Sequence, residues 1–147
     1  MEVFLFVIGG IFYACIEILW RGYTHWTMFV LGGACFVVLG LLNEYKIPWH
    51  WCLLRQTVVG ACIVTIFEFT VGCIVNLWLG WNVWDYSDLP FNILGQICLY
   101  FSLLWIPLCA SGIILDDWLR YWRYLLVKKW CPWKQIQTRE RPHYRLV

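Results

Sequence analysis

Long apolar runs, separated by short polar segments, dominate the pattern of hydrophobic and polar positions along this chain. A helix that crosses a bilayer needs about 20 predominantly apolar residues. Four runs approach or reach this length, and they predict membrane spans at about residues 3–20, 27–42, 57–79 and 91–115. The pattern therefore predicts an all-α, polytopic membrane protein whose residues 1–115 form a four-transmembrane-helix bundle.

The start of the last apolar run carries signals that are typical of a helix N-terminus. Pro90 suits the first helical turn, because its missing N–H would have no helical partner there. Ser87 or Asp88 can cap the turn by accepting hydrogen bonds from free backbone N–H groups. We therefore expect the fourth helix to begin close to Phe91.

The composition also indicates a membrane protein. Apolar residues make up 62% of the chain and charged residues only 14%, whereas soluble domains average about 25% charged residues. Trp and Tyr gather where the runs end, as expected for rings that favour the headgroup level. Most of the eight cysteines lie inside the runs, where a thiol behaves as a small apolar residue. No CxxC pair or Cys/His cluster with zinc spacing occurs in the sequence, so we expect no metal and no cofactor.

Residues 116–147 differ sharply from the rest of the chain, since they contain eight of the eleven Lys and Arg residues. Between Trp118 and Trp130 the basic residues are mixed with aromatic ones. This mixture predicts a basic interfacial helix with its rings in the lipid boundary and its cations at the headgroups. We expect the segment to bind membrane lipids through their anionic headgroups, and we expect no nucleic-acid partner.

The distribution of cations predicts the orientation in the cell membrane. Cytoplasmic loops carry an excess of Lys and Arg, so the basic C-terminus is expected in the cytoplasm. Four spans place the N-terminus on the same side. The 43–56 loop, which has two cations, then faces the cytoplasm, and the 80–90 loop, which has Asp85 and Asp88 but no cation, faces outside.

Two glutamates lie inside the predicted spans, where ionisable residues are costly and mark functional candidates. Arg21 follows Glu17 by four residues, so the two can pair on one helix face. The pair is either a structural ion pair or an arginine held to receive an anionic group. Glu68 has no cation within one helical turn. It either fixes helix packing through an interhelical hydrogen bond or serves as a proton, cation or ligand site.

Further polar residues are expected at a similar depth. Asn92 and Gln96 are four residues apart, which places them on one face of the expected fourth helix. On the basis of depth, we expect the outer polar groups to converge on one pocket. Its expected substrate- or ion-binding residues are Glu17, Arg21, Glu68, Asp85, Tyr86 and Asn92. The expected supporting residues are Gly72, Asn76, Trp84, Ser87, Gly95 and Gln96.

Several catalytic motifs are absent from the sequence. It has no Gly-rich phosphate loop, so we do not expect the chain itself to hydrolyse ATP. It also lacks the GxSxG motif of many hydrolases and the HExxH motif of zinc proteases. We therefore assign no catalytic residue from motifs.

One arrangement of residues resembles a known family. Residues 68–72 read Glu-Phe-Thr-Val-Gly, residues 84–87 read Trp-Asp-Tyr-Ser, and Pro90, Asn92, Gly95 and Trp105 follow. Over roughly residues 5–115, the chain resembles the CmpB-type family labelled putative ABC-transporter type IV, or ABC transporter permease. It is also similar to the vertebrate transmembrane protein 229 group. The resemblance implies a transport role, and coupling to ATP hydrolysis would require a partner subunit.

Three functions are open on this basis. The first is a small integral membrane transport component in which Glu68 responds to protons or ions. Because four short helices enclose little volume, we expect a homo-oligomer or a partner subunit. The second is a membrane-embedded enzyme that acts on a lipid or isoprenoid substrate, with Glu17, Glu68 and Asp85 as acid–base groups. The third is a non-catalytic accessory or lipid-binding subunit.

Overall fold

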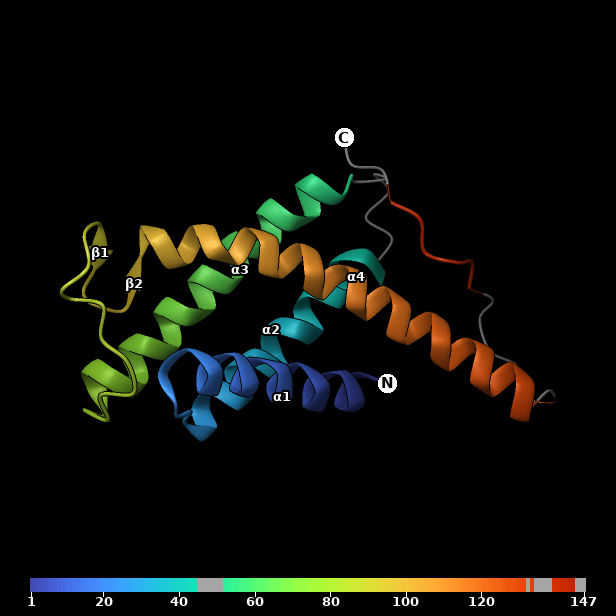
Figure 1. Cartoon of the computed structure of the whole chain (residues 1–147), viewed down its shortest axis with the longest axis horizontal. Helices are drawn as coiled ribbons and strands as arrows, with labels where there is room; N and C mark the ends of the chain where they lie inside the picture. The colour runs from blue at the N-terminus through green and yellow to red at the C-terminus, as the bar shows by residue number, and fades with distance from the viewer. Residues whose placement is uncertain (45–51, 132, 134–138, 145–147) are drawn as a thin grey trace.

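The computed structural model describes residues 1–44, 52–131, 133 and 139–144, and they form a mainly helical protein (Figure 1). The elements follow in the order α1 (Glu2–Arg21), α2 (Trp26–Glu44), α3 (Leu53–Gly72), the π-helix η1 (Cys73–Trp78), β1 (Asn92–Ile93), β2 (Ile97–Cys98) and α4 (Leu99–Trp130). The expected helical fold is confirmed, with one short antiparallel hairpin formed by β1 and β2. Part of the expected 43–56 cytoplasmic loop and parts of the C-terminal tail lie outside the described residues.

Three of these helices are long and apolar enough to cross a membrane. They are Glu2–Arg21, Leu53–Trp78, in which η1 continues α3 without a break, and Leu99–Trp130. The apolar part of α2, Trp26–Leu42, is shorter. Together with the apolar composition, these helices make the chain a membrane protein.

The fourth helix begins later than its sequence signals indicate, and the expected start at Phe91 is wrong. Residues 92–98 form the β1–β2 hairpin instead, and α4 begins at Leu99 after Cys98 in an extended conformation. The side-chain amide of Asn92 donates hydrogen bonds to the backbone oxygens of Ser87 and Leu89, at 3.1 and 2.7 Å. Such local bonds offer the backbone an alternative to the helix, so Pro90 lies in a turn rather than in a first helical turn.

The chain does not break at residue 115, the expected end of the fourth span. α4 is one continuous helix of 32 residues, so the basic segment from Trp118 to Trp130 is its C-terminal part rather than a separate element. Figure 1 shows this part of α4 extending past the N-terminus, at the end of the molecule opposite the hairpin.

Helices α1 and α2 pack closely through two pairs of glycines. A Cβ atom added at Gly10 would lie 2.7 Å from the backbone oxygen of Phe29, and one at Gly33 would lie 2.6 Å from the backbone oxygen of Phe6. Gly9 and Gly32 face the side chains of Phe36 and Tyr13 in the same way. Small residues therefore let the two backbones approach, as is common between membrane helices.

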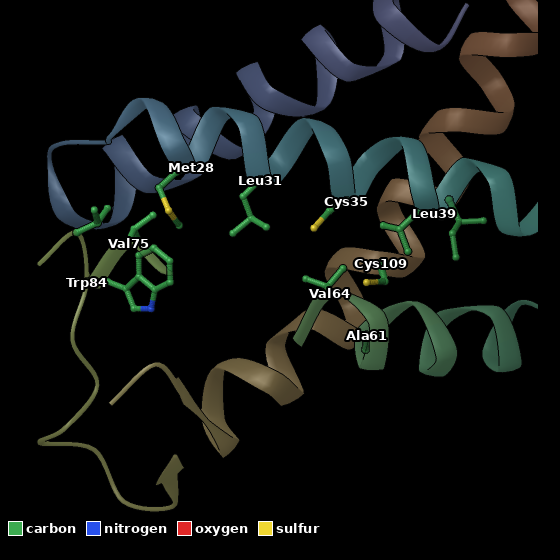
Figure 2. Close-up of a cluster of buried hydrophobic side chains, with 11 residues drawn as sticks. Met28, Leu31, Cys35, Leu39, Ala61, Val64, Val75, Trp84 and Cys109 are labelled. Atoms are coloured by element: carbon green, nitrogen blue, oxygen red, sulfur yellow. The ribbon is translucent and has the colours of Figure 1, made fainter. Parts of the chain in front are cut away.

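The apolar core lies where α2 meets α3 and α4 (Figure 2). Met28, Leu31, Cys35 and Leu39 recur at intervals of three or four residues and form one buried face of α2. They pack against a set contributed by the other elements: Ala61, Val64, Val75, Val83, Trp84, Cys109 and Ile113. This core joins the helices to the loop after η1, which carries several of the candidate site residues.

Candidate functional site

The carboxylate of Glu68 is the most deeply buried of the predicted site groups, with 1% of the residue exposed. It lies on α3 and accepts two hydrogen bonds from other parts of the chain. The phenol of Tyr86 donates to Oε1 at 3.2 Å, and the indole Nε1 of Trp105 on α4 donates to Oε2 at 2.9 Å. In the part of the chain that the structure describes, Glu68 forms no salt bridge.

Stacked rings hold both donors in place. Trp105 stacks on Tyr13 of α1, with ring centroids 5.7 Å apart and planes 18° apart. Tyr86 stacks on Phe101 of α4, with centroids 4.8 Å apart. Aromatic pairs of this kind add to the free energy of area burial by about 0.5–1.5 kcal/mol. The environment of Glu68 is therefore assembled by α1, α3, α4 and the loop that carries Tyr86.

The phenol of Tyr86 is fixed as a hydrogen-bond donor. Burial raises the pKa of Tyr86 well above its usual value, and the neighbouring Glu68 carboxylate raises it further. Both effects disfavour the negatively charged phenolate. Tyr86 therefore stays protonated at neutral pH and can donate to Glu68.

Glu17 and Arg21 form a second part of this site at the C-terminal end of α1. An Oε1 to NH2 distance of 2.7 Å joins them in the i,i+4 ion pair that their spacing predicts. Thr24 donates to the other oxygen of Glu17 at 2.7 Å, and Arg21 NH1 donates to the backbone oxygen of Val83 at 2.9 Å. Arg21 thus ties the end of α1 to the loop after η1.

The two parts lie within electrostatic reach of each other. The Arg21 guanidinium partly offsets the rise in the pKa of Tyr86, so the charge of the second part acts on the first. The Arg21 side chain is 19% exposed, and its Nε is a buried donor without a hydrogen-bond partner among the described residues. We call this set, Glu17, Arg21, Glu68, Tyr86 and Trp105, the Glu68 cluster.

A network of neutral polar groups anchors the loop to η1. The side chain of Asn76 donates to Gln96 Oε1 at 2.8 Å and accepts from the backbone N–H of Val83 at 2.7 Å. The Trp84 indole donates to the backbone oxygen of Gln96 at 2.9 Å. A Cβ at Gly72 would lie 2.7 Å from Gln96 Oε1, so the absence of a side chain there makes room for the network. Short π-helices such as η1 are frequent at functional sites.

The remaining predicted site residues lie in the turn before the hairpin and in the hairpin itself, and among the described residues no hydrogen bond joins them to Glu68. Asp85 is exposed, and its Oδ1 accepts hydrogen bonds from the backbone N–H and the hydroxyl of Ser87. These bonds lower the pKa of Asp85 below its usual value. Asn92 bridges turn carbonyls and accepts from the N–H of Gly95 at 3.1 Å.

The expectation that Asn92 and Gln96 share a helix face is wrong, because both lie in the hairpin region. Gly95 has a φ of 67°, a left-handed conformation that favours glycine. Phe91 and Leu94 adopt left-handed φ angles of 56° and 51° despite their large side chains. Backbone strain of this kind persists only where the surroundings determine it, and here the bonds of Asn92 to Ser87, Leu89 and Gly95 do so.

Sequence reasoning missed Tyr13, Thr24 and Trp105 as neighbours of the site. The sequence alone could have indicated Trp105 as a partner of Glu68, because a buried carboxylate needs hydrogen-bond donors and an indole N–H inside an apolar run needs an acceptor. The sequence gives no comparable indication for Tyr13, since aromatic residues in apolar spans commonly face lipid or pack in the core.

A second charged cluster, at the other end of the helices, was also missed. Arg120 on α4 donates to Asp116 Oδ2 at 2.7 Å through Nε, and its two terminal nitrogens reach the oxygens of Glu2 at 3.0 and 3.1 Å. Asp116 is 1% exposed. Tyr144 donates to the neighbouring Asp117 at 3.1 Å. The sequence predicts that Asp116 and Arg120 lie in a segment outside the spans. In the structure, α4 continues past residue 115 and both residues are buried.

No group of three or more His, Cys, Asp or Glu side chains suited to a metal ion occurs within the described ranges. The fold and the two charged clusters define a small helical membrane protein that holds ionisable groups inside an apolar helix assembly.

A family model described as putative ABC-transporter type IV matches residues 4–131, and the chain belongs to this family. The match extends past residue 115 into the basic part of α4. The family name describes an ABC-type transport component. Searches of the curated proteins and of the solved structures found no match.

Proposed function

We propose that the chain is a small integral membrane transport component in which Glu68 takes up and releases a proton during transport. One observation carries the proposal. Glu68 is buried, yet it is held by two neutral donors and forms no salt bridge within the described part of the chain. An intramembrane carboxyl group without a fixed cation partner is a functional candidate by default.

The geometry supports both protonation states of Glu68. When it is ionised, the Tyr86 and Trp105 donors stabilise its charge, as hydrogen bonds to a carboxylate do. When it is protonated, the burial cost of the charge disappears. Neither donor carries a full positive charge, so neither locks the group in its ionised form.

Arg21 extends this proposed site toward an anionic or polar substrate. Its side chain is 19% exposed, and its buried Nε has no hydrogen-bond partner among the described residues. Glu17 and the backbone of Val83 fix its position. Arginine suits the recognition of carboxylates and phosphates, because its planar fork can donate two hydrogen bonds at once.

A multi-pass topology in the cell membrane, with both termini in the cytoplasm, is part of the proposal. The Glu2–Arg120 and Asp117–Tyr144 contacts bring the N-terminus and residue 144 to the same end of the helices. That end also carries most of the cations of the chain, as cytoplasmic segments do. The loop with Asp85 and Asp88 and the hairpin that follows it then lie outside.

A partner or a second copy completes the proposed transport unit. The sequence has no phosphate-binding loop, so ATP hydrolysis would come from a separate subunit. Many apolar side chains on the outer faces of α1 and α4 are exposed, and lipid, a copy of this chain or another subunit can cover them.

Proton movement through the reconstituted chain tests the proposal. Liposomes with a pH-sensitive dye inside would receive an external pH jump while valinomycin and K⁺ hold the membrane potential at zero. We expect the wild-type chain to equilibrate the internal pH faster than empty liposomes. Glu68→Gln, which keeps the size of the side chain but cannot titrate, should return the rate to that of empty liposomes.

Thr70→Val is the matched control, because Thr70 lies on the same helix, is exposed, and bonds only its own helix backbone at Ile66. It should leave the flux unchanged. If Glu68→Gln conducts like the wild type, Glu68 is a packing residue, and if the wild type is no faster than empty liposomes, the chain does not carry protons; either result overturns the proposal.

A further inference from the structure

Helix α4 is too long to be accommodated within a bilayer core by itself. Its 32 residues span about 48 Å at about 1.5 Å per residue, whereas the hydrocarbon core is about 30 Å thick. On a path along the membrane normal, roughly 12 residues would therefore lie outside the core.

The charged cluster of Glu2, Asp116 and Arg120 marks the end of the apolar part. α1 begins at Glu2, and Arg120 binds Glu2 directly, so this level corresponds to one boundary of the helix assembly. The residues from Leu99 to Leu115 contain no charge. The part of α4 from Trp118 to Trp130 therefore continues past this boundary, and Figure 1 shows it extending beyond the N-terminus.

This protruding part has an exposed apolar face. Trp122, Leu125, Leu126 and Trp130 recur at intervals that bring them to one side of a helix. All four are exposed, with Trp122 at 61% and Trp130 at 71%. An uncovered aromatic helix face requires a partner surface, because large apolar side chains are costly to leave in water.

Cations lie on the same face. Arg123 precedes Trp130 by seven residues, and Lys129 follows Trp122 by seven. Seven residues are close to two full helical turns, so each cation lies almost in line with a tryptophan. Both cations are exposed, as is Lys128 beside the ring of Tyr124. No acidic residue occurs between Trp118 and Trp130.

We infer that the C-terminal part of α4 is a docking surface for anionic lipid headgroups, and that it anchors this end of the protein in the membrane interface. Charge complementarity favours anionic lipid headgroups over a protein partner at this surface. A protein partner would have to match both exposed indoles and three cations, whereas a headgroup layer with anionic lipids provides an apolar boundary and negative charge together. Trp favours that level of the membrane because its ring is apolar and its N–H is polar.

Lipid selectivity of the reconstituted full chain tests the inference. Electron paramagnetic resonance would compare the protein-bound fractions of spin-labelled phosphatidylserine and phosphatidylcholine in phosphatidylcholine bilayers. We expect the wild type to prefer phosphatidylserine, and this preference to fall as salt screens the cations. The triple variant Arg123→Gln, Lys128→Gln, Lys129→Gln should lose the preference. The matched control Arg123→Lys, Lys128→Arg, Lys129→Arg keeps the charge at each position and should retain it.

Hydrogen exchange gives an independent measurement on the same samples. Residues 118–130 should exchange more slowly in nanodiscs that contain phosphatidylserine than in nanodiscs of phosphatidylcholine alone, and the neutral triple variant should show no such difference. Protection that rises with protein concentration and ignores lipid charge would mean that a second copy covers this face. That result, or a triple variant that still prefers phosphatidylserine, would overturn the inference.

Discussion

At the scale of single residues, the sequence predicts that Glu68 needs a hydrogen-bonding partner but does not predict which residues provide it. Its position inside an apolar run is enough to say that it needs a partner. The partners themselves come from 18 and 37 residues further along the chain, in the loop and on α4. Periodicity relates residues one or two helical turns apart, so it identifies the Glu17–Arg21 pair but not the Tyr86 and Trp105 contacts.

Trp105→Phe should destabilise the protein, because it leaves Glu68 Oε2 buried without its indole donor. A buried polar group that loses its partner costs about 1–3 kcal/mol, and we expect the free energy of unfolding to fall by about that amount. SDS titration of the protein in mild detergent micelles measures it. Trp122→Phe, at an exposed position on the same helix, is the control and should change little. Equal effects of the two substitutions would contradict the role of the indole.

Ser87→Ala should raise the pKa of Asp85 toward its usual value, because the Ser87 hydroxyl is one of the two groups that lower it. Since the folded-state pKa is lowered, the turn contributes stability above the unfolded pKa and loses it as the pH falls through the folded pKa. NMR titration of the ¹³C-labelled Asp85 carboxyl group measures the change. Ser111→Ala, whose hydroxyl bonds only Pro107, should leave this titration unchanged.

At the scale of elements, apolar runs indicate where helices lie but not always where they begin. α1, α2 and α3 begin within a few residues of the expected runs. The fourth helix was misjudged because Pro90 and Ser87 are as suitable for a turn as for a helix start. The bonds from Asn92 to two carbonyls, together with the left-handed residues, form the hairpin instead. A two-residue strand pair has no hydrophobic alternation long enough to recognise in a sequence.

Gly33→Ala should weaken the contact between α1 and α2. The new Cβ would lie 2.6 Å from the backbone oxygen of Phe6, which cannot move without shifting α1. Overpacking of this kind costs about 1–3 kcal/mol. Gly112→Ala is the matched control, since its nearest neighbour, a side-chain atom of Leu39, lies at 3.5 Å. There alanine fits and should raise the free energy of unfolding slightly, by up to about 1 kcal/mol. Thermal unfolding in micelles would show whether each variant is less or more stable than the wild type.

At the scale of the whole molecule, charge is concentrated at the two ends of the helices. The Glu68 cluster lies toward the hairpin, and the cluster of Glu2, Asp116 and Arg120 lies toward the N-terminus. Composition predicted the membrane class, and the distribution of Lys and Arg predicted a distinct C-terminal segment. Neither pattern could predict that α4 continues through residue 115 and carries Asp116 and Arg120 into contact with α1.

Arg120→Gln should destabilise the protein far more than Arg123→Gln. Arg120 binds both Asp116 and Glu2, and its removal leaves the carboxylate of Asp116 buried without this cation. Breaking a buried ion pair from one side costs about 3–5 kcal/mol. Arg123 is exposed three residues further along the same helix, and its substitution should cost less than about 0.5 kcal/mol. Comparable melting temperatures for the two variants would show that the Arg120 contacts contribute little.

The contact between Glu2 and Arg120 has a consequence for the order of events during synthesis. The two residues are 118 positions apart, so the ribosome must add 118 residues after Glu2 before the two side chains can meet. Until then, the Glu2 carboxylate lacks its arginine partner, and a charged group is costly to move into the hydrocarbon core. Helix α1 is therefore made before α2, α3 and α4, yet its contact at Glu2 forms only once α4 has been made.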